Sequence, residues 1–514
     1  MTEPIDETLL DTSVAPRNRL AMQVVSVVLL LALALALRVY RLQDESITRD
    51  ELACAAYLHH PTLGEYMVKR AHDDPAIVMP LYFVSQYYWG RLVGLSPIPL
   101  RILPLAFSMA TLVVLYLFGR RLLGHTAGIV ALMCATFSKL LIFESQELRM
   151  YAFTFFFALA SVYALYRALN DAQRHWWVLN VLFTACLVWT HILALPLLVV
   201  EGLFLIASRP REIGLQIRWG IAVSIPVLAM PIYVLTATEA PSDEMGWMPL
   251  PWRARFISTF LYTFTGSKMD HFDELAHAVG NQWGAVLLTV FFTVAGLWLV
   301  VRMLLAPPAG LGPQETLRRR QTFALLTFWL VIPASVLYVT SYVYRPCYIE
   351  RYAYHSAFAA YLGLGCAIAL LPSRYLRVAS IAVLAGIYAL LATDLVRPLR
   401  PNFASGIAYI NENATAGDVF AATDVNSRIP TNYYLQQGAT PVLSPDEFTD
   451  YVVKNATEGN RVWAVFYAEY PINPKEFEER LRANGIVSDV RIFPGWQDLR
   501  VYKLTREAPK TAAG

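Results

Sequence analysis

The sequence predicts a mostly α-helical fold: a polytopic membrane helix bundle followed by a small soluble α/β domain at the C-terminus. Two observations carry this prediction. Of the 514 residues, 56% are hydrophobic and 16% are charged, whereas soluble domains average about 45–50% and about 25%. The mean hydropathy is +0.43, and the apolar residues form runs long enough to cross a bilayer. An ordinary soluble enzyme is therefore excluded.

Hydropathy predicts about eleven transmembrane spans in residues 1–396. The first covers 20–37 and is read as an uncleaved span, because the segment before it is long and carries Glu3, Asp6 and Glu7. The other spans are expected near 102–119, 126–143, 150–165, 176–190, 193–207, 219–235, 285–301, 323–340, 357–371 and 378–391.

The basic residues predict the orientation. Arginines recur in the connections after every second span, and such residues favour the cytoplasmic side. These are Arg17 and Arg19; Arg120 and Arg121; Arg167 and Arg174; Arg209, Arg211 and Arg218; Arg302 and Arg318–Arg320; and Arg374 and Arg377. These connections, and with them the N-terminus, are therefore expected on the cytoplasmic side of the inner membrane, and the number of spans is odd. The C-terminal residues then lie outside.

One apolar stretch is not expected to cross. Residues 80–94 carry Tyr82, Phe83, Tyr87, Tyr88 and Trp89, an aromatic belt typical of a helix at the membrane interface. Counting this stretch as a span would also invert every later loop.

Three extracytoplasmic segments are longer than a connection requires: 38–100, 236–284 and 397–514. The last is predicted to be a separate domain. Its runs RVWAVFYAE and LRVYKL alternate as strands do, while PKEFEERLRANG has a helical pattern.

Several functional classes find no support. The net charge of +3 comes without a basic and aromatic stripe for nucleic acid. Five cysteines form neither a disulfide framework nor zinc spacing, and Cys54 and Cys347 are expected to be free thiols, with a disulfide between them as the alternative. Nucleotide-binding and metalloprotease motifs are absent from the sequence. A group donor used outside the cell would therefore arrive attached to lipid.

The first loop holds the first candidate site residues. In RVYRLQDESITRDELACAAYL, Asp50 is either the N-cap of a helix or a general base close to the membrane, and the two roles are compatible. Glu51 stands beside it. Further on, His72, Asp73 and Asp74 are suited to a metal or a sugar, but also to an ordinary turn before a proline.

Other candidates lie at the outer ends of later spans. ESQELRMYAF contains Glu144, Glu147, Arg149 and Tyr151, which either pair structurally or bind a ligand. His191 is read as a core histidine or a site residue, and Glu201 is expected to face the bundle interior. YRPCYIERYAYH supplies Arg345 and Arg351, whose guanidinium groups suit a phosphate or simply extend to the interface.

An ordered set of motifs resembles a known family. It comprises the acidic pair in R-D-E, P-L-Y-F before the aromatic helix, L-R at the next span, G-R-R-L-L-G at its inner end, and Q-E-L-R-M-Y-A. Together they resemble bacterial membrane glycosyltransferases related to dolichyl-phosphate-mannose protein mannosyltransferases and to the aminoarabinose transferase of lipid A, enzymes of the C-type glycosyltransferase fold. The resemblance covers roughly the first 210 residues.

The resemblance implies a polyprenyl-phosphate-linked sugar donor and transfer on the extracytoplasmic face. It implies that Asp50 is the catalytic base, that Glu51 assists it, and that Glu147, Arg149 and Tyr151 lie near the active site. This chain has A-I-V-M-P-L-Y where relatives often have D-x-H-P-P-L-Y. This departure weakens the case for a metal or acceptor role of His72, Asp73 and Asp74.

The function predicted is an inverting transfer of a hexose or pentose to an acceptor hydroxyl on a protein, lipid or glycan. An arginine or lysine is expected to hold the donor phosphate, and the candidates are Lys69, Arg149, Arg345 and Arg351. Candidates for binding the substrates are Asp74, Glu147, Tyr151 and His191. A divalent metal remains an open alternative. The competing functions are a transporter or flippase of lipid-linked sugars and a membrane scaffold.

Overall fold

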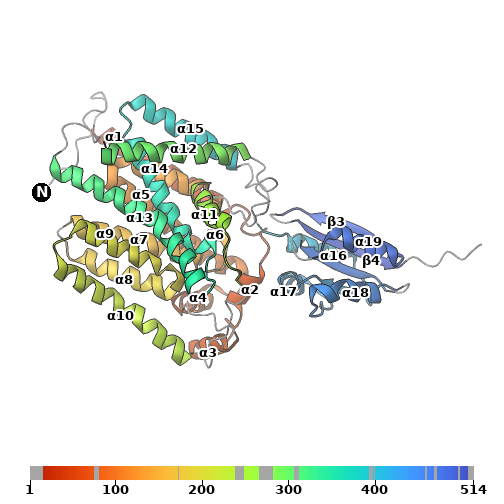
Figure 1. The fold of residues 1–514 in the computed structure, drawn as a ribbon. Helices are drawn as coiled ribbons and strands as arrows, with labels where there is room; N and C mark the ends of the chain where they lie inside the picture. Colours follow the sequence, from red (N-terminus) through yellow and green to blue (C-terminus); the bar gives the residue numbers. More distant parts are fainter. Residues whose placement is uncertain are drawn as a thin grey trace, which may run out of the picture.

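The structure is a computed structural model. It describes residues 16–73, 80–171, 173–237, 248–265, 282–305, 312–392, 398, 400–457, 460–467, 472–495 and 498–506. Most described residues belong to a bundle of helices that lie roughly side by side. A four-stranded sheet with its own helices lies at one end of this bundle, next to α2 (Figure 1).

The elements of the bundle follow the chain in order. They are α1 Pro16–Val39, α2 Arg49–Ala55, α3 Leu63–Asp73, α4 Pro80–Val93, α5 Pro97–Phe137, α6 Lys139–Gln146, α7 Tyr151–Asn170, α8 His175–Thr190, η1 Ile192–Ala194, α9 Pro196–Ser208, α10 Ile213–Ala237, α11 Arg253–Thr265, α12 Gln282–Val300, η3 Val301–Leu305, α13 Pro313–Val343, η4 Glu350–Ser356, α14 Ala357–Ala369 and α15 Arg374–Ala392.

The chain is an integral membrane protein with several apolar helices. Every stretch expected to span lies mainly on a helix. Within the described ranges, seven helices are long and apolar enough to cross a membrane, and two shorter apolar helices cover His175–Thr190 and Ile192–Ser208. The total of eleven spans stays a prediction. The stretch 80–94 forms α4, whose place at the interface is likewise a prediction.

The long α5 contains the two expected spans 102–119 and 126–143 up to Phe137. Leu123 and Gly124 have non-helical dihedral angles, and Gly124 has a φ of 78°, so α5 is two helices joined at a turn. Glycine adopts such a φ without steric cost. The two arms approach closely, because a Cβ at Gly119 would lie 2.7 Å from the Cα of Gly128.

Helix α14 packs against α5 through another close contact. A Cβ placed on Gly365 would lie 2.3 Å from the carbonyl oxygen of Ala127. Small residues allow helix backbones to approach each other in membranes, where dispersion contacts replace the hydrophobic effect as the driving force. Glu201 of α9 is fully buried and accepts hydrogen bonds from Asn180 and Thr184 of α8, as its predicted inward position requires.

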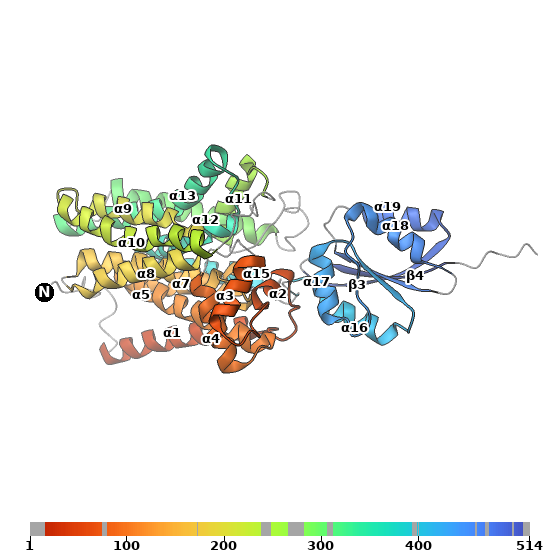
Figure 2. The same ribbon diagram turned by 90° about the horizontal axis from the view of Figure 1, so that it is seen from below.

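Several of the connection arginines meet at one end of the bundle. Arg121 and Arg167 both pair with Asp171, which follows α7, and Arg209 after α9 donates to the carbonyl oxygen of Leu169. Helix α2 and the C-terminal sheet lie at the other end (Figure 2). This arrangement is consistent with the basic end facing the cytoplasm, and the orientation itself remains a prediction.

The C-terminal α/β segment, residues 400–506, contains a sheet in the order β1-β2-β4-β3. Its elements are α16 Phe403–Asn413, β1 Val419–Ala422, α17 Val425–Tyr434, α18 Pro445–Asn455, β2 Val462–Tyr467, α19 Pro474–Ala483, β3 Ile486–Phe493 and β4 Leu499–Arg506. β1 and β2 are parallel, β4 is antiparallel to both β2 and β3, and the register pairs Val465 with Val501.

Alternating side chains give this sheet two covered faces. On β2, Val462, Ala464 and Phe466 face the core that α18 and α19 complete. Trp463 and Val465 face the core formed with α16. The strand and helix patterns predicted for RVWAVFYAE, LRVYKL and PKEFEERLRANG are confirmed as β2, β4 and α19, although the role of residues 397–514 as a separate domain stays a prediction.

All five cysteines lie within the described ranges and are free. Cys54 and Cys347 are both buried thiols. The alternative of a disulfide between them is therefore not formed in this structure.

The contact between Gly365 and Ala127 gives a test of the bundle. We expect Gly365→Ala to destabilise the protein by about 1–3 kcal/mol, because the added Cβ forces two helix backbones apart. Gly363→Ala is the matched control, since the nearest atom to its Cβ would be a flexible Leu299 methyl group at 3.8 Å. Thermal unfolding of the detergent-solubilised variants measures the difference. Equal stabilities of the two variants would contradict the packing described.

Candidate active site

The loop after α1 leads into α2 through a complete capping box. The Thr48 hydroxyl accepts a hydrogen bond from the amide of Glu51, and the Glu51 carboxylate accepts one from the amide of Thr48. Such reciprocal bonds satisfy donors that a helix start leaves unpaired. Thr48 is thus the N-cap, and the alternative that Asp50 has this role is wrong. Asp50 is the second residue of α2, after Arg49.

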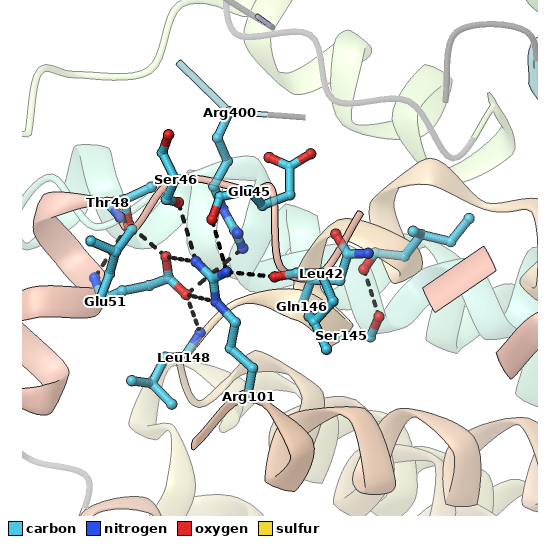
Figure 3. A network of polar contacts seen from close by, with 12 residues as sticks. Leu42, Glu45, Ser46, Thr48, Glu51, Arg101, Ser145, Gln146, Leu148 and Arg400 are labelled. Carbon is cyan, nitrogen blue, oxygen red and sulfur yellow. Dashed lines mark hydrogen bonds and ion pairs between the residues drawn. The ribbon is translucent and has the colours of Figure 1, made fainter. Parts of the chain in front are cut away.

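Glu51 is the centre of a buried polar network (Figure 3). Arg101 of α5 donates to both carboxylate oxygens, from Nε at 2.9 Å and from Nη2 at 2.8 Å. The amide of Leu148, which follows α6, donates to Oε1 at 3.0 Å. Both Glu51 and Arg101 are almost completely inaccessible to solvent. Glu51 therefore joins α2, α5 and the turn before α7.

Arg400 approaches the same carboxylate from the C-terminal side. Its Nη2 lies 3.8 Å from Glu51 Oε1, and its side chain is 2% exposed. Burial alone would raise the pKa of the Glu51 carboxyl, but the charges of Arg400 and Arg101, with the hydrogen bonds from Arg101 and Leu148, hold this pKa below its usual value. Glu51 is thus ionised and saturated with donors. This environment suits a structural anchor better than a group that exchanges protons.

Arg101 also fixes the loop that precedes α2. Its Nη1 donates to the carbonyl oxygens of Leu42 and Glu45, and its Nη2 donates to that of Ser46. A guanidinium group has five donors in a rigid plane. Arg101 can therefore bind the Glu51 carboxylate and three loop carbonyl groups at the same time.

Asp50 has the opposite environment. Its side chain is 50% exposed, and its carboxylate forms an ion pair with Nη1 of Arg149, which is 17% exposed. Burial would lower the pKa of Arg149, but Asp50 and the neighbouring Tyr151, Glu147 and Cys54 together outweigh burial and raise this pKa well above its usual value. The structural alternative in which Arg149 pairs mainly with Glu147 is thus replaced by a contact with the first loop.

Arg149 belongs to a group of rings and charges at the outer end of α7. The guanidinium groups of Arg149 and Arg351 lie 5.2 Å and 5.6 Å from the ring centre of Tyr151. His191 lies 5.7 Å from the same ring and 5.0 Å from that of Tyr352. Three loops far apart in the sequence therefore meet at Tyr151, next to Asp50.

Acidic side chains complete this group. Glu144 and Glu147 are buried, and both raise the pKa of Arg351 by their charges. The Glu147 Oε2 atom has no hydrogen-bond partner in the part of the chain that the structure describes. Glu144 also lines a small cavity between α5, α6 and α7, together with Ser108, Thr111 and Ser145. The site thus contains two arginines and three carboxylates within one region.

The histidine of this region is uncharged. Burial, with the charges of Arg149, His355 and Arg351, lowers the pKa of His191 to about 3. His355 nearby accepts a hydrogen bond from Trp329 Nε1 at 3.1 Å, and burial lowers its pKa to about 4. Both imidazoles are therefore neutral at physiological pH. The fixed positive charge of the site comes from arginine.

The structure brings together most of the predicted site residues. Asp50, Glu51, Glu147, Arg149, Tyr151, His191 and Arg351 belong to the two connected groups described above. The described contacts of two donor candidates lie elsewhere: the Lys69 ammonium lies 5.8 Å from the ring of Tyr57, and the Arg345 amide donates to the Thr340 carbonyl.

Asp74 lies outside the described residues, as do most residues of the expected loop 236–284. Within the described ranges, no three His, Cys, Asp or Glu side chains are grouped so that they could hold a metal ion.

Sequence reasoning missed Arg101 and Arg400 as site residues. Arg101 was noticed only as part of a motif, although a lone arginine in the apolar run PLRILPL signals a buried partner. Arg400 lies in LVRPLRPNF, which offers no such signal. Its importance depends on a contact between residues 349 positions apart.

The pair of Glu51 and Arg101 predicts a strong effect on stability. Arg101→Gln should destabilise the protein by about 3–5 kcal/mol, because an ionised carboxylate loses its main partner while it stays buried. Adding Glu51→Gln should recover part of this loss, since glutamine keeps the capping box. Thermal unfolding of both variants measures the coupling. Arg480→Gln is the control, because its pair with Asp450 is exposed and should contribute at most about 1 kcal/mol.

Comparison with known proteins gives one match to a family model. Residues 77–235 match the family described as dolichyl-phosphate-mannose-protein mannosyltransferase. The matched region runs from just before α4 to the end of α10 and includes Arg101, Arg149, Tyr151 and His191. Asp50 and Glu51 precede it. No curated protein matches the sequence.

Solved structures of membrane transferases are similar in outline. The apo structure of ArnT from Cupriavidus metallidurans is 13% identical, with a TM-score of 0.41, and the alignment covers 93% of this chain and 97% of that one. ArnT bound to undecaprenyl phosphate gives 14% identity, a TM-score of 0.40 and the same coverage.

The Archaeoglobus fulgidus oligosaccharyltransferase tethered to an acceptor peptide is 11% identical, with a TM-score of 0.48 and coverage of 91% and 69%. The match of residues 77–235 to the family model supports a relationship to these mannosyltransferases. The chain is a membrane glycosyltransferase related to the dolichyl-phosphate-mannose-protein mannosyltransferases.

Proposed function

We propose that this enzyme transfers a sugar from a polyprenyl-phosphate-linked donor to an acceptor hydroxyl at the extracytoplasmic face, with inversion, and that Asp50 is the general base. The observation that carries the proposal is the contrast between two adjacent acids. Glu51 is buried and saturated, whereas Asp50 is half exposed and pairs with Arg149 beside a cluster of arginine and aromatic side chains.

The proposed reaction is a single displacement. Asp50 accepts the proton of the acceptor hydroxyl while its oxygen forms a bond to the anomeric carbon. The bond from that carbon to the phosphate oxygen breaks, and polyprenyl phosphate leaves with the electron pair. Attack and departure occur on opposite faces, so the anomeric configuration inverts. Proton transfer to a positioned base typically contributes about 10²–10⁴-fold to the rate.

Arg149 and Arg351 are the best candidates to hold the donor phosphate. A leaving phosphate gains negative charge in the transition state, and guanidinium groups stabilise such charge through paired hydrogen bonds. Arg149 offers Nη1 to Asp50, while its buried Nε has no hydrogen-bond partner among the described residues. The same side chain is therefore suited to orient the base and to contact the donor.

Neutral and aromatic groups are proposed to bind the sugar. Tyr151 and His191 present ring surfaces next to the arginines, and Glu147 offers an oxygen with no described partner. Lys69, Asp74 and Arg345 remain candidates for contacts that form only with substrate. The C-terminal α/β segment is proposed to be an extracytoplasmic domain, and the acceptor is a hydroxyl of a protein, lipid or glycan.

Substitution of Asp50 tests the proposal directly. Asp50→Asn should lower turnover by about 10²–10⁴-fold, because an amide cannot accept the hydroxyl proton. The measurement is release of polyprenyl phosphate by purified protein from a panel of polyprenyl-phosphate-linked sugars. Asp44→Asn is the matched control, since Asp44 is an exposed acid of the same loop. Normal turnover by folded Asp50→Asn protein would overturn the proposed role of Asp50.

A second test separates the donor candidates. Arg351→Gln should raise KM for the lipid-linked donor about 10- to 100-fold, the loss expected when a charged hydrogen bond of about 1.5–3 kcal/mol is removed. Arg345→Gln should change this KM much less, because the arginines that the structure describes at the Tyr151 ring are Arg149 and Arg351. Steady-state kinetics with varied donor gives both values. The reverse order of effects would assign the phosphate to Arg345.

A further inference from the structure

The loop that carries Asp50 is held from two directions. On the side of the helix bundle, Arg101 binds both Glu51 and carbonyl groups of the loop. The Leu148 amide binds Glu51 as well. On the other side, four contacts come from the C-terminal α/β segment and fall on four different residues within 46–51. Both sets of contacts therefore meet at Ser46 and Glu51.

The contacts from the C-terminal segment are specific. The Ser46 hydroxyl accepts a hydrogen bond from the Ala404 amide at 2.9 Å, in the first turn of α16. The Ile47 amide donates to the Tyr434 hydroxyl at 2.8 Å, at the end of α17. Both bonds involve a backbone group on one partner and a hydroxyl on the other. The second bond holds the loop backbone at Ile47, and the first holds the Ser46 side chain.

Two side-chain contacts also join the C-terminal segment to residues 49 and 51. Arg49 Nη1 donates to Asn426 Oδ1 at 3.0 Å, and the Arg400 guanidinium lies 3.8 Å from Glu51. None of the Arg400 side-chain nitrogens has a hydrogen-bond partner in the described ranges, although the side chain is almost fully buried. The Arg400 charge lowers the pKa of the Glu51 carboxyl, as do the charge and the hydrogen bonds of Arg101. This arginine therefore acts on the loop through its charge.

We propose that Arg400 and Tyr434 of the C-terminal α/β segment are positioning residues for Asp50, acting through Glu51 and the Ile47 amide. Neither needs to touch substrate. Because Asp50 is the immediate neighbour of Glu51 on a helix of seven residues, any rotation of that short helix moves the Asp50 carboxylate away from Arg149. The C-terminal segment thereby contributes to turnover. The inference rests on the proposed role of Asp50 as base.

Hydrogen exchange tests the contact independently of activity. Tyr434→Phe removes only the hydroxyl that accepts from the Ile47 amide, so exchange at Ile47 should become about 2- to 10-fold faster, the effect of one net hydrogen bond. Tyr433→Phe is the matched control, because Tyr433 is an exposed neighbouring ring. Unchanged exchange in Tyr434→Phe would overturn the inference.

Kinetics of the same full-length variants tests the consequence. Tyr434→Phe and Arg400→Gln should lower kcat several-fold and leave the donor KM within about twofold, since the phosphate-binding arginines are untouched. Arg400→Lys keeps the charge and should restore most of kcat, while Arg482→Gln, at an exposed position, should have no effect. Faster exchange with unchanged kcat would overturn the positioning role. Normal turnover by Asp50→Asn would instead refute the base, and the exchange result would still stand.

Discussion

The organisation of the outer end depends on one buried carboxylate. Glu51 is inaccessible to solvent, yet it bonds to Arg101 of α5, to the amide after α6 and to the cap of its own helix, with Arg400 nearby. An isolated buried charge would cost many kcal/mol, and only paired, hydrogen-bonded charges persist in such a place. The network therefore tolerates little displacement of any part. The loop before α2 is held in place by the bonds of Arg101 to its carbonyl groups.

Helix geometry explains how this anchor serves its neighbour. Successive residues of a helix point about 100° apart, so when Glu51 faces the core, Asp50 faces away from it toward Arg149. The buried acid holds the helix in place, and the half-exposed acid is the one proposed to meet the substrate. A base held by a rigid neighbour is pre-organised, which reduces the reorganisation needed at the moment of reaction. In the proposed mechanism, Glu51 therefore positions α2, and Asp50 on the same helix acts as the base.

The sequence was sufficient for the helices and for much of the site. Long apolar runs have few alternatives in a bilayer, so each expected span lies mainly on a helix. The charges of Asp50, Glu147, Arg149 and Arg351 stood out because charge near hydrocarbon is rare. Pairing was not predictable, since Arg149 contacts Asp50 across 99 residues and Arg400 contacts Glu51 across 349. The interpretation of Asp50 as an N-cap was wrong because Thr48 and Asp50 are both good capping residues.

The arginines and the histidines of the site differ in their charge near neutral pH. Arg149 and Arg351 keep their charge over any physiological range, since both have a pKa raised further by their neighbours. His191 and His355 stay neutral because burial lowers the pKa of each. Positive charge for a phosphate is therefore constant, and the buried histidines cannot add to it near neutral pH. A change in activity with pH near neutrality is therefore not expected to come from these four residues. In the proposed reaction, the positive charge that binds the donor phosphate therefore does not depend on pH near neutrality.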